Sequence, residues 1–568
     1  MPKGRVFDRH MSCLNAVEGC EEAVEPEKHD VLARASYRAQ TDVLKDLIAQ
    51  APGFDHQNHY CSTVPCVSVR AEHLDLRAFL EETVRIEDVG RVGFVSFTQW
   101  PFALAALAES ALTFQDMGSQ ITMAFWSSRT PMKDTGWGTY AGLARFFGGR
   151  TTDEAFLESL IAAGVPATGS VHPPIKAWRP EDAPRITRPL NRSAIRTLSY
   201  RGSPMGRAML QIRPDTETPI TDRFFWPRRL LQAAATSYAW AYDQTSALIR
   251  DRNLDSLVVY NGRFLHDRAA AAAGEAAGIS VWYYDSGGID TDFELTDSIT
   301  HDWSDLQRRM LVMYDEWPTD LRDEVGESWF TDRINHAAPD NSLFVEAQES
   351  GHGIQRPDAD VVVVYFSSSG DEIAELELDW SRFLGEQPRA LQALADEVRK
   401  RPNWALVVRS HPHKRMKPKD DVAEWMNAVK EAKPDVHVDH HSSVDSYTLM
   451  RQADIVVTYG STTGVEAAYA GKPVIVMGPS AYDELGCATF AGTEAELTQA
   501  LDEAQPGSWS GAVSYGLMMR RRGLHLKHVE LRDGRYFVGG RAISDPPKVA
   551  QHISHALHRV WRRYSERR

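Results

Sequence analysis

One pattern constrains the fold more than any other: a buried strand, a turn rich in hydrogen-bond donors, and the start of a helix. Its clearest copy is DIVVTYGSTTGVEAAYAGKPVIVMG, residues 454–478, where an apolar strand ends in small hydroxyl residues before a short helix and a second apolar strand. A helix that starts directly after a strand presents unpaired backbone N–H groups and the positive end of its dipole. Such a helix start suits a phosphate group.

The residues around this helix start support the interpretation. Thr463 and Glu466 have the spacing of a capping box, in which a hydroxyl and a carboxylate satisfy the first backbone N–H groups of a helix. Alanines follow as good helix formers, and Gly471 ends the helix. The sequence therefore predicts that the helix starts at the hydroxyl cluster.

Two further strands end in the same way. The strand in NWALVVRSHPHK, residues 403–414, stops at Arg409, Ser410, His411, Pro412, His413 and Lys414. The strand in DADVVVVYFSSSGDE, residues 358–372, stops at Ser367, Ser368 and Ser369, and Ser369 and Glu372 repeat the capping-box spacing. Ligands of open α/β sheets bind outside the carboxyl ends of the strands, so these strand ends predict one shared anion site.

The alternation of strands and helices predicts an α/β protein with two Rossmann-like, doubly wound domains. A chain of 568 residues is too long for one hydrophobic core. We expect an N-terminal extension (1–88), a first domain (89–300) with a proline-rich insertion at about 129–227, a linking region (301–357), a second domain (358–545) and a C-terminal crossover helix (546–568).

Composition limits the partners and the compartment. The formal net charge of −15 argues against a general attraction to nucleic acid or anionic lipid. The basic segments 518–528 and 558–568 are read as a solvated helix face and tail; the alternative is peripheral contact of the C-terminal helix with the inner membrane face. Five scattered cysteines, with no signal-peptide core and no apolar run of about 20 residues, favour a cytoplasmic protein.

No metal site is expected. His56, His59, Cys61 and Cys66 match no common zinc spacing. Asp290 and Asp292 form a DxD match, but two carboxylates at this spacing occur often by chance.

The two-domain pattern resembles the GT-B glycosyltransferase architecture. Its motifs resemble the capsule polysaccharide biosynthesis family, which includes bacterial Kdo transferases of capsule export systems, and the related bacterial polysialyltransferases. The resemblance is good over residues 255–478 and poor over the first 250. It is carried by SSSGDEIAELELDW (367–380), RSHPH (409–413), YGSTTGVEAAYAGKPVI (459–475) and YNGRFLHDRAAAAAGEAAGISVWYYDSGG (260–288).

The resemblance implies a bacterial enzyme that transfers a sugar from a nucleotide-activated donor, with CMP-linked donors favoured over UDP-linked ones. The acceptor would be a glycan or another polymer, and neither a metal nor a cofactor beyond the donor would be needed. The implied nucleotide-binding residues are Ser367, Ser368, Ser369, Arg409, His411, Lys414, Ser461, Thr462, Thr463 and Glu466. His411 would donate to a phosphate oxygen, while Glu466 would accept ribose hydroxyls or serve only as a cap.

The catalytic candidates lie in the first domain. Asp285 is the candidate general base, with His266 and Asp267 behind it, although the family commonly has Glu where this chain has Asp285. Asn261 and Arg263 directly follow a strand, so they either belong to the site or hold a loop.

Three alternatives stay open. A CDP-glycerol-type polyol-phosphate transferase shares the His-Pro motif and a Ser-rich turn. A nucleotide-sugar 2-epimerase of similar architecture would convert the donor without an acceptor. A non-catalytic nucleotide-sugar-binding subunit would bind a nucleotide and turn over no donor.

Overall fold

The computed structural model describes residues 90–98, 100–126, 152–165, 183–211, 223–300, 302–338, 345–369 and 380–543. Four predicted features lie outside these ranges in whole or in part: the N-terminal extension, the group of His56, His59, Cys61 and Cys66, the capping box of Ser369 with Glu372, and the C-terminal crossover helix. Among the residues that the structure describes, no helix is long and apolar enough to cross a membrane.

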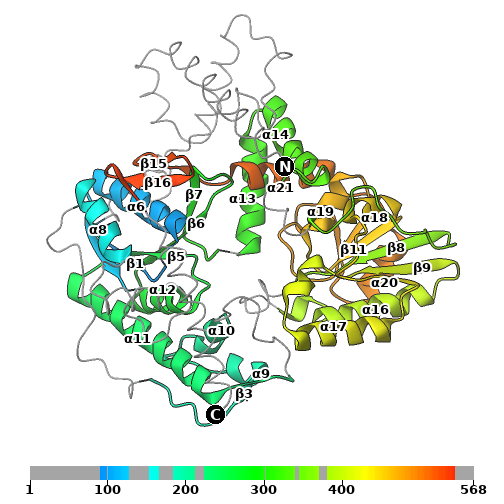
Figure 1. The fold of residues 1–568 in the computed structure, drawn as a ribbon, viewed down its shortest axis with the longest axis horizontal. Helices are drawn as coiled ribbons and strands as arrows, with labels where there is room; N and C mark the ends of the chain where they lie inside the picture. The colour runs from blue at the N-terminus through cyan, green and yellow to red at the C-terminus, as the bar shows by residue number, and fades with distance from the viewer. Residues whose placement is uncertain are drawn as a thin grey trace, which may run out of the picture.

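The first domain is built on a six-stranded sheet, on the left in Figure 1. Its order is β14 (Leu524–His525), β7 (Asp292–Thr296), β6 (Ser280–Ser286), β5 (Ser256–Tyr260), β1 (Arg91–Ser96) and β2 (Gln120–Phe125). The strands β2, β1, β5 and β6 run parallel, whereas β7 is antiparallel to β6 and β14 is antiparallel to β7. Chain order reverses between β1 and β5, so the topological switch point lies there.

Helices cover both faces of this sheet. Along β5, Leu257 and Val259 point into one core with α11 (Arg228–Arg252) and α12 (Leu265–Ala277), while Val258 and Tyr260 point into another with α6 (Pro101–Asp116). A strand buried on both faces is typical of a parallel sheet. The described parts of the predicted insertion form α8 (Thr152–Ala162), β3 (Leu190–Asn191), α9 (Arg192–Arg196), α10 (Met205–Leu210) and β4 (Phe225–Trp226).

The second domain has the strand order of Rossmann folds. Its parallel sheet reads β10 (Val436–Val438), β9 (Trp404–Arg409), β8 (Val361–Phe366), β11 (Ile455–Thr458), β12 (Val474–Val476) and β13 (Thr489–Phe490). In chain order this is third, second, first, fourth, fifth and sixth, with the switch point between β8 and β11. The expected pair of Rossmann-like domains is confirmed.

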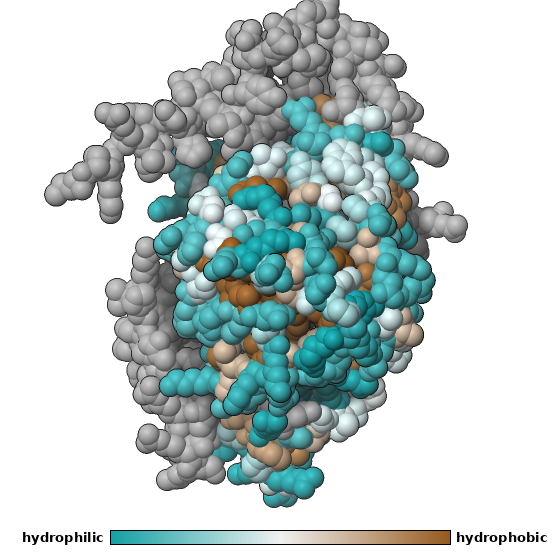
Figure 2. Space-filling view, turned by 90° about the vertical axis from the view of Figure 1, so that its right-hand side faces the viewer, coloured by the Kyte–Doolittle hydropathy of each residue, from teal (hydrophilic) through white to brown (hydrophobic). Residues whose placement is uncertain are grey.

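The helices of the second domain also form two layers. One face of the sheet packs against α16 (Gln387–Arg399), α17 (Lys419–Ala432) and α20 (Glu494–Asp502). The other face packs against α13 (Trp303–Glu316), α14 (Thr319–Ile334), α18 (Ser446–Gln452), α19 (Thr462–Tyr469) and α21 (Trp509–Arg521). The described part of the domain also has two 3₁₀ helices, η5 (Trp380–Arg382) and η6 (Pro412–Met416). Figure 2 shows this domain from outside, where hydrophilic side chains cover most of the face.

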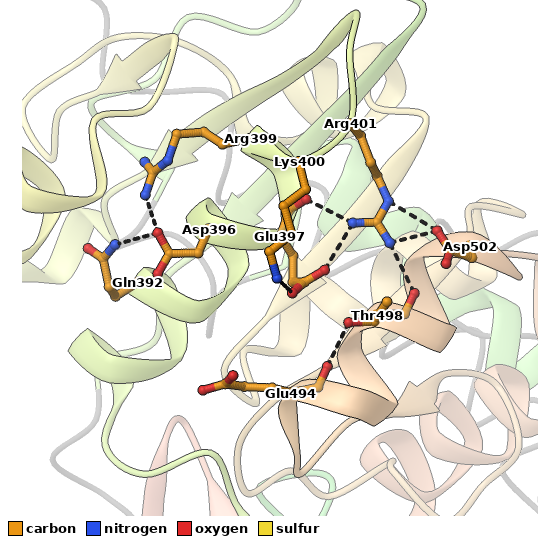
Figure 3. Close-up of polar contacts among 9 residues, drawn as sticks. All are labelled: Gln392, Asp396, Glu397, Arg399, Lys400, Arg401, Glu494, Thr498 and Asp502. Carbon is orange, nitrogen blue, oxygen red and sulfur yellow. Dashed lines mark hydrogen bonds and ion pairs between the residues drawn. The ribbon is translucent and has the colours of Figure 1, made fainter.

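Charged side chains join α16 to α20 (Figure 3). Arg401 donates to Asp502 Oδ1 at 2.6 Å, to Glu397 Oε2 at 3.1 Å and to the Thr498 carbonyl at 3.2 Å. Burial of Glu397 opposes ionisation, but hydrogen bonds from Lys400, Arg401 and Thr498 outweigh it and lower the pKa of this carboxyl. The network therefore stabilises the helix layer at neutral pH.

The C-terminal part of the described chain returns to the first domain. After α21, β14 joins the first sheet, and β15 (Val529–Arg532), β16 (Arg535–Val538) and β17 (Arg541–Ala542) form a small sheet beside α6. The buried Glu109 on α6 accepts the backbone N–H groups of His528, at 2.6 Å, and Val529, at 3.0 Å. Residues 524–543 therefore belong with the first domain, not with the second, where the sequence analysis placed them.

Candidate functional site

A pocket lies at the switch point of the second sheet, beyond the carboxyl ends of β8, β9 and β11. Its empty volume is about 540 Å³, part of it open to solvent. Six of the ten residues predicted to bind a nucleotide line it: Ser367, Arg409, His411, Thr462, Thr463 and Glu466. Ligands of open α/β sheets bind at such switch points, so the pocket lies where a nucleotide is expected.

The other four predicted residues do not line this pocket. The Ser368 hydroxyl is buried and donates to the Tyr459 carbonyl at 2.6 Å, so it ties β8 to the end of β11. The Lys414 ammonium lies 4.7 Å from the centre of the Trp425 ring. Ser461 caps α19, and Ser369 follows Ser368 outside the lining. Hydroxyl and amine groups in these motifs therefore also hold the loops in place.

Arg409 supplies a buried positive charge. Its side chain is 2% exposed, and its guanidinium donates to the backbone carbonyls of Asp439 at 2.7 Å and Val444 at 3.3 Å. Among the described residues, no carboxylate forms an ion pair with it, and its Nε has no hydrogen-bond partner. Burial lowers its pKa to about 10, which still leaves it protonated at neutral pH. A buried cation without a carboxylate favours an anionic ligand.

The geometry of His411 fixes which ring nitrogen carries the proton. Its backbone N–H donates to Ser367 Oγ at 2.8 Å, which joins the ends of β9 and β8. The backbone N–H of His413 donates to His411 Nδ1 at 3.1 Å. Because Nδ1 accepts, the neutral imidazole carries its proton on Nε2. His411 therefore has the tautomer that can donate to a phosphate oxygen through Nε2.

The helix α19 starts two residues earlier than the predicted capping box places it. Its first residue is Thr462, and the N-cap is Ser461, whose Oγ accepts the Thr463 N–H at 3.3 Å. The preceding Gly460 has φ +82, and a Cβ there would lie 1.8 Å from the Pro479 carbonyl oxygen, so this tight turn requires glycine. The predicted capping box of Thr463 and Glu466 is wrong, because Glu466 bonds elsewhere.

Glu466 forms a buried ion pair at the pocket wall. Its Oε1 accepts from Arg333 Nε at 2.7 Å and from the Tyr447 hydroxyl at 3.3 Å. The Arg333 and Glu466 side chains are 8% and 4% exposed, and the Arg333 guanidinium lies over the Trp329 ring at 4.4 Å. The ion pair closes one side of the pocket. The contact of Glu466 with ribose stays a prediction.

Several lining residues come from outside the three motifs and were not predicted from the sequence. Arg333 lies on α14 and Gln348 follows it, both within the predicted linking region, while Ser446 and Tyr447 start α18. Gln348 Oε1 accepts the Ser446 N–H at 2.7 Å. On the sequence, Arg333 looks like any charged residue of a surface helix, so no local signal marked it.

In the first domain, the structure brings Asp285 and Asn261 together. Asn261 directly follows β5 at the switch point, and its amide Nδ2 donates to the carboxylate of Asp285 on β6. Burial raises the pKa of Asp285, although hydrogen bonds from the Ser286 backbone and Asn261 oppose the shift. A carboxyl group with a raised pKa is a better proton acceptor.

None of the first-domain candidates, Asp285 and Asn261 included, lines the pocket. His266 and Asp267 are in the first turn of α12 and are 2% and 3% exposed, and the His266 ring stacks on Phe97 at 5.2 Å. The Arg263 guanidinium lies over the Phe264 ring at 5.4 Å. The interior position of His266 and Asp267 suits support of the sheet edge, and their catalytic role stays a prediction.

Among the described residues, one group of side chains could hold a metal ion. Asp439, His440 and His441 place ligand atoms within 4.8 Å of one another on the loop after β10. Asp292 of the DxD match is buried, and its Oδ1 lies 3.1 Å from His525 Nδ1. Asp292 therefore binds the returning strand β14, and the expectation of metal-independent chemistry stays a prediction.

One family model matches part of the second domain. Residues 378–506 match the family model described as capsule polysaccharide biosynthesis protein. A comparison with curated protein sequences gave no match. Among solved structures, the KpsC beta Kdo 2,7 transferase of Thermosulfurimonas dismutans is 15% identical, with 56% of this chain and 90% of that chain covered and a TM-score of 0.31.

Two other similar structures belong to different kinds of enzyme. A UDP-GlcNAc 2-epimerase from Neisseria meningitidis, bound to UDP-GlcNAc, is 10% identical, with 75% of this chain and 97% of that chain covered and a TM-score of 0.22. The spinosyn rhamnosyltransferase SpnG is 14% identical, with coverages of 76% and 95% and a TM-score of 0.22. Similarities this low do not establish a shared activity.

The family match, by contrast, includes the RSHPH motif and the hydroxyl-rich turn before α19. Both motifs line the pocket. The resemblance drawn from them is therefore confirmed over this segment: residues 378–506 of the chain carry the signature of the capsule polysaccharide biosynthesis family.

Proposed function

We propose that the protein is a glycosyltransferase that binds a nucleotide-activated sugar in the second-domain pocket and transfers the sugar to a glycan or another polymer. A CMP-linked donor is favoured, and a UDP-linked donor is the second choice. The observation that carries the proposal is Arg409, a buried cation that lines the pocket and pairs with no carboxylate of the described residues. A phosphate group would supply the missing negative charge.

The other pocket residues fit the same ligand. His411 offers Nε2–H, and the start of α19 offers the Thr462 and Thr463 hydroxyls together with the positive end of the helix dipole. These donors would stabilise the charge that develops on a departing nucleotide phosphate, without a metal ion.

Asp285 completes the proposed reaction. The acceptor hydroxyl forms the new glycosidic bond, Asp285 accepts the proton of that hydroxyl, and the nucleotide leaves with the electron pair of the broken bond. Asp285 has a raised pKa and lies at the carboxyl end of β6, which suits a proton acceptor. The protein would act in the cytoplasm, where nucleotide sugars are available, with peripheral contact to the membrane as an extension of this proposal.

A turnover assay separates the proposal from its alternatives. The purified chain would be incubated with CMP-Kdo, CMP-sialic acid, UDP-GlcNAc or CDP-glycerol, with and without oligosaccharide acceptors, and the released nucleotide measured. Sugar transfer that Asp285→Asn abolishes would support the proposal. Turnover of CDP-glycerol alone would indicate a polyol-phosphate transferase, and an altered donor sugar without nucleotide release would indicate an epimerase. Tight nucleotide binding without any turnover would indicate a non-catalytic subunit.

A further inference from the structure

Asn261 adopts a backbone conformation that few residues tolerate. Its φ is +52, in the left-handed region, and Gly262 follows with φ +72. A Cβ on Gly262 would lie 2.4 Å from the Tyr283 ring, so no larger residue fits at this position after β5. Asparagine tolerates a positive φ better than most residues but at a cost, and such strain tends to persist where function requires it.

The side chain of Asn261 is only half satisfied. It is 4% exposed; Nδ2 donates to Asp285, and no donor among the described residues reaches the buried Oδ1. A buried acceptor without a donor costs folding free energy. Asn261 thus combines a strained backbone with an unsatisfied acceptor. The side-chain interaction that it makes under these conditions is the hydrogen bond to Asp285.

We propose that Asn261 is a positioning residue that holds the Asp285 carboxylate in place for the acceptor hydroxyl. The proposal rests on the function proposed above, in which Asp285 is the base. The strand-end turn fixes the Asn261 backbone, since its N–H donates to the Tyr284 carbonyl at 2.9 Å. The amide is therefore anchored to β6, the strand that also carries Asp285.

Other groups facing Asp285 come from several elements. The Ser286 N–H donates to its Oδ1 at 2.8 Å, and Glu294 lies opposite on β7. Glu294 pairs with Arg309 from α13 at 2.9 Å and lies 3.6 Å from Arg522, which follows α21.

The same groups act on the pKa of Asp285. Burial and the charge of Glu294 raise it, whereas the Ser286 and Asn261 hydrogen bonds and the charge of Arg522 lower it. Behind this layer, the buried phenols of Tyr260 and Tyr284 lie within the electrostatic range of both Asp285 and Asp267. Two described side chains donate to the carboxylate: the Ser286 hydroxyl, to Oδ1 at 3.5 Å, and the Asn261 amide, to Oδ2 from the end of β5.

The contact can be tested without a substrate. Asn261→Gly keeps the positive φ accessible and removes the amide, so the pKa of Asp285 should rise further. Relative to wild type, the variant should lose melting temperature as the pH rises from about 4 to 7, because ionised Asp285 then lacks the hydrogen bond from the Asn261 amide. The pH-dependent part of this difference should vanish in the Asp285→Asn background. A difference from wild type that does not change with pH, or a pH-dependent part that persists in that background, would overturn the proposal.

Asn253→Gly is the matched control. Asn253 has φ +48 at the C-cap of α11, so the same substitution acts on a similar backbone. It should show no pH-dependent difference from wild type, in either the wild-type or the Asp285→Asn background.

The kinetic consequence is measured on whichever probe donor the wild type turns over. Asn261→Gly should lower kcat by about 10- to 100-fold at unchanged KM for the donor. It should also shift the acidic limb of the pH profile to higher pH. If kcat and the acidic limb of the pH profile were both unchanged, the positioning role would be refuted. If wild type turns over no probe, the proposed function fails, while the melting comparison still decides whether Asn261 holds Asp285.

Discussion

Replacing Arg333 with methionine would test how the pocket wall is built. The change keeps most of the apolar stem against Trp329 but removes the guanidinium that lies 2.7 Å from Glu466 Oε1. Because both side chains are more than nine-tenths buried, the Glu466 carboxylate would stay in a region with little access to water. Removing one partner of a buried ion pair lowers the free energy of unfolding by about 3–5 kcal/mol.

The double variant Arg333→Met, Glu466→Gln measures the coupling directly. Replacing both partners removes the unpaired charge, so the double variant should lose about 2 kcal/mol less than the two single losses added together. Arg356→Met is the matched control, since Arg356 pairs with Asp454 at 2.6 Å but both side chains are about 40% exposed. Its loss should stay below about 1 kcal/mol.

Urea unfolding followed by tryptophan fluorescence supplies the free energies. If the two single losses in unfolding free energy added up to that of the double variant, the account of a buried ion pair that closes the pocket would be refuted. A loss from Arg333→Met no larger than that from Arg356→Met would refute it as well.

Three further variants test other parts of the structure. Arg409→Gln should weaken nucleotide binding about 10- to 100-fold by calorimetry, because a charged donor to phosphate is lost; unchanged affinity would contradict this. Arg401→Met should destabilise the protein by about 1–2 kcal/mol at pH 7, and the loss should shrink below pH 4.5, since Glu397 contributes stability above its unfolded pKa and loses it as the pH falls through the lowered folded value. His528→Gln should expose residues 524–543 to hydrogen exchange at pH 6 but not at pH 9, because the bond to Glu109 raises the pKa of His528 and its stabilisation is lost as the pH rises through that value. An increase in exchange over wild type that is equal at pH 6 and pH 9 would refute this prediction.

The sheets could be predicted because their signals are local. Apolar runs such as those of β8 and β11 are buried on both faces, and Gly460 and Ser461 mark the turn after β11. The order of the strands then brings Ser367, at the end of β8, and Thr462, after β11, to one pocket. Local pattern and topology together therefore located most of the site.

The misses come from contacts between distant parts of the chain. Arg333 and Glu466 are 133 residues apart, and their ion pair overrides the local capping spacing of Thr463 and Glu466. The strand β14 has two residues and pairs with β7, which lies more than 200 positions earlier, so its sequence gives almost no strand signal. Long-range pairing of short segments cannot be read from periodicity.

The measurement that tests the central claim most directly is isothermal titration of CMP, CDP, UDP and GDP into wild type, His411→Ala and His413→Ala. His411 lines the pocket, whereas His413 does not line it and contacts His411 through its backbone N–H and the edge of its ring. The account predicts one nucleotide site in wild type, lost in His411→Ala and kept in His413→Ala. Binding that is absent from wild type, or equal in all three proteins, would contradict it.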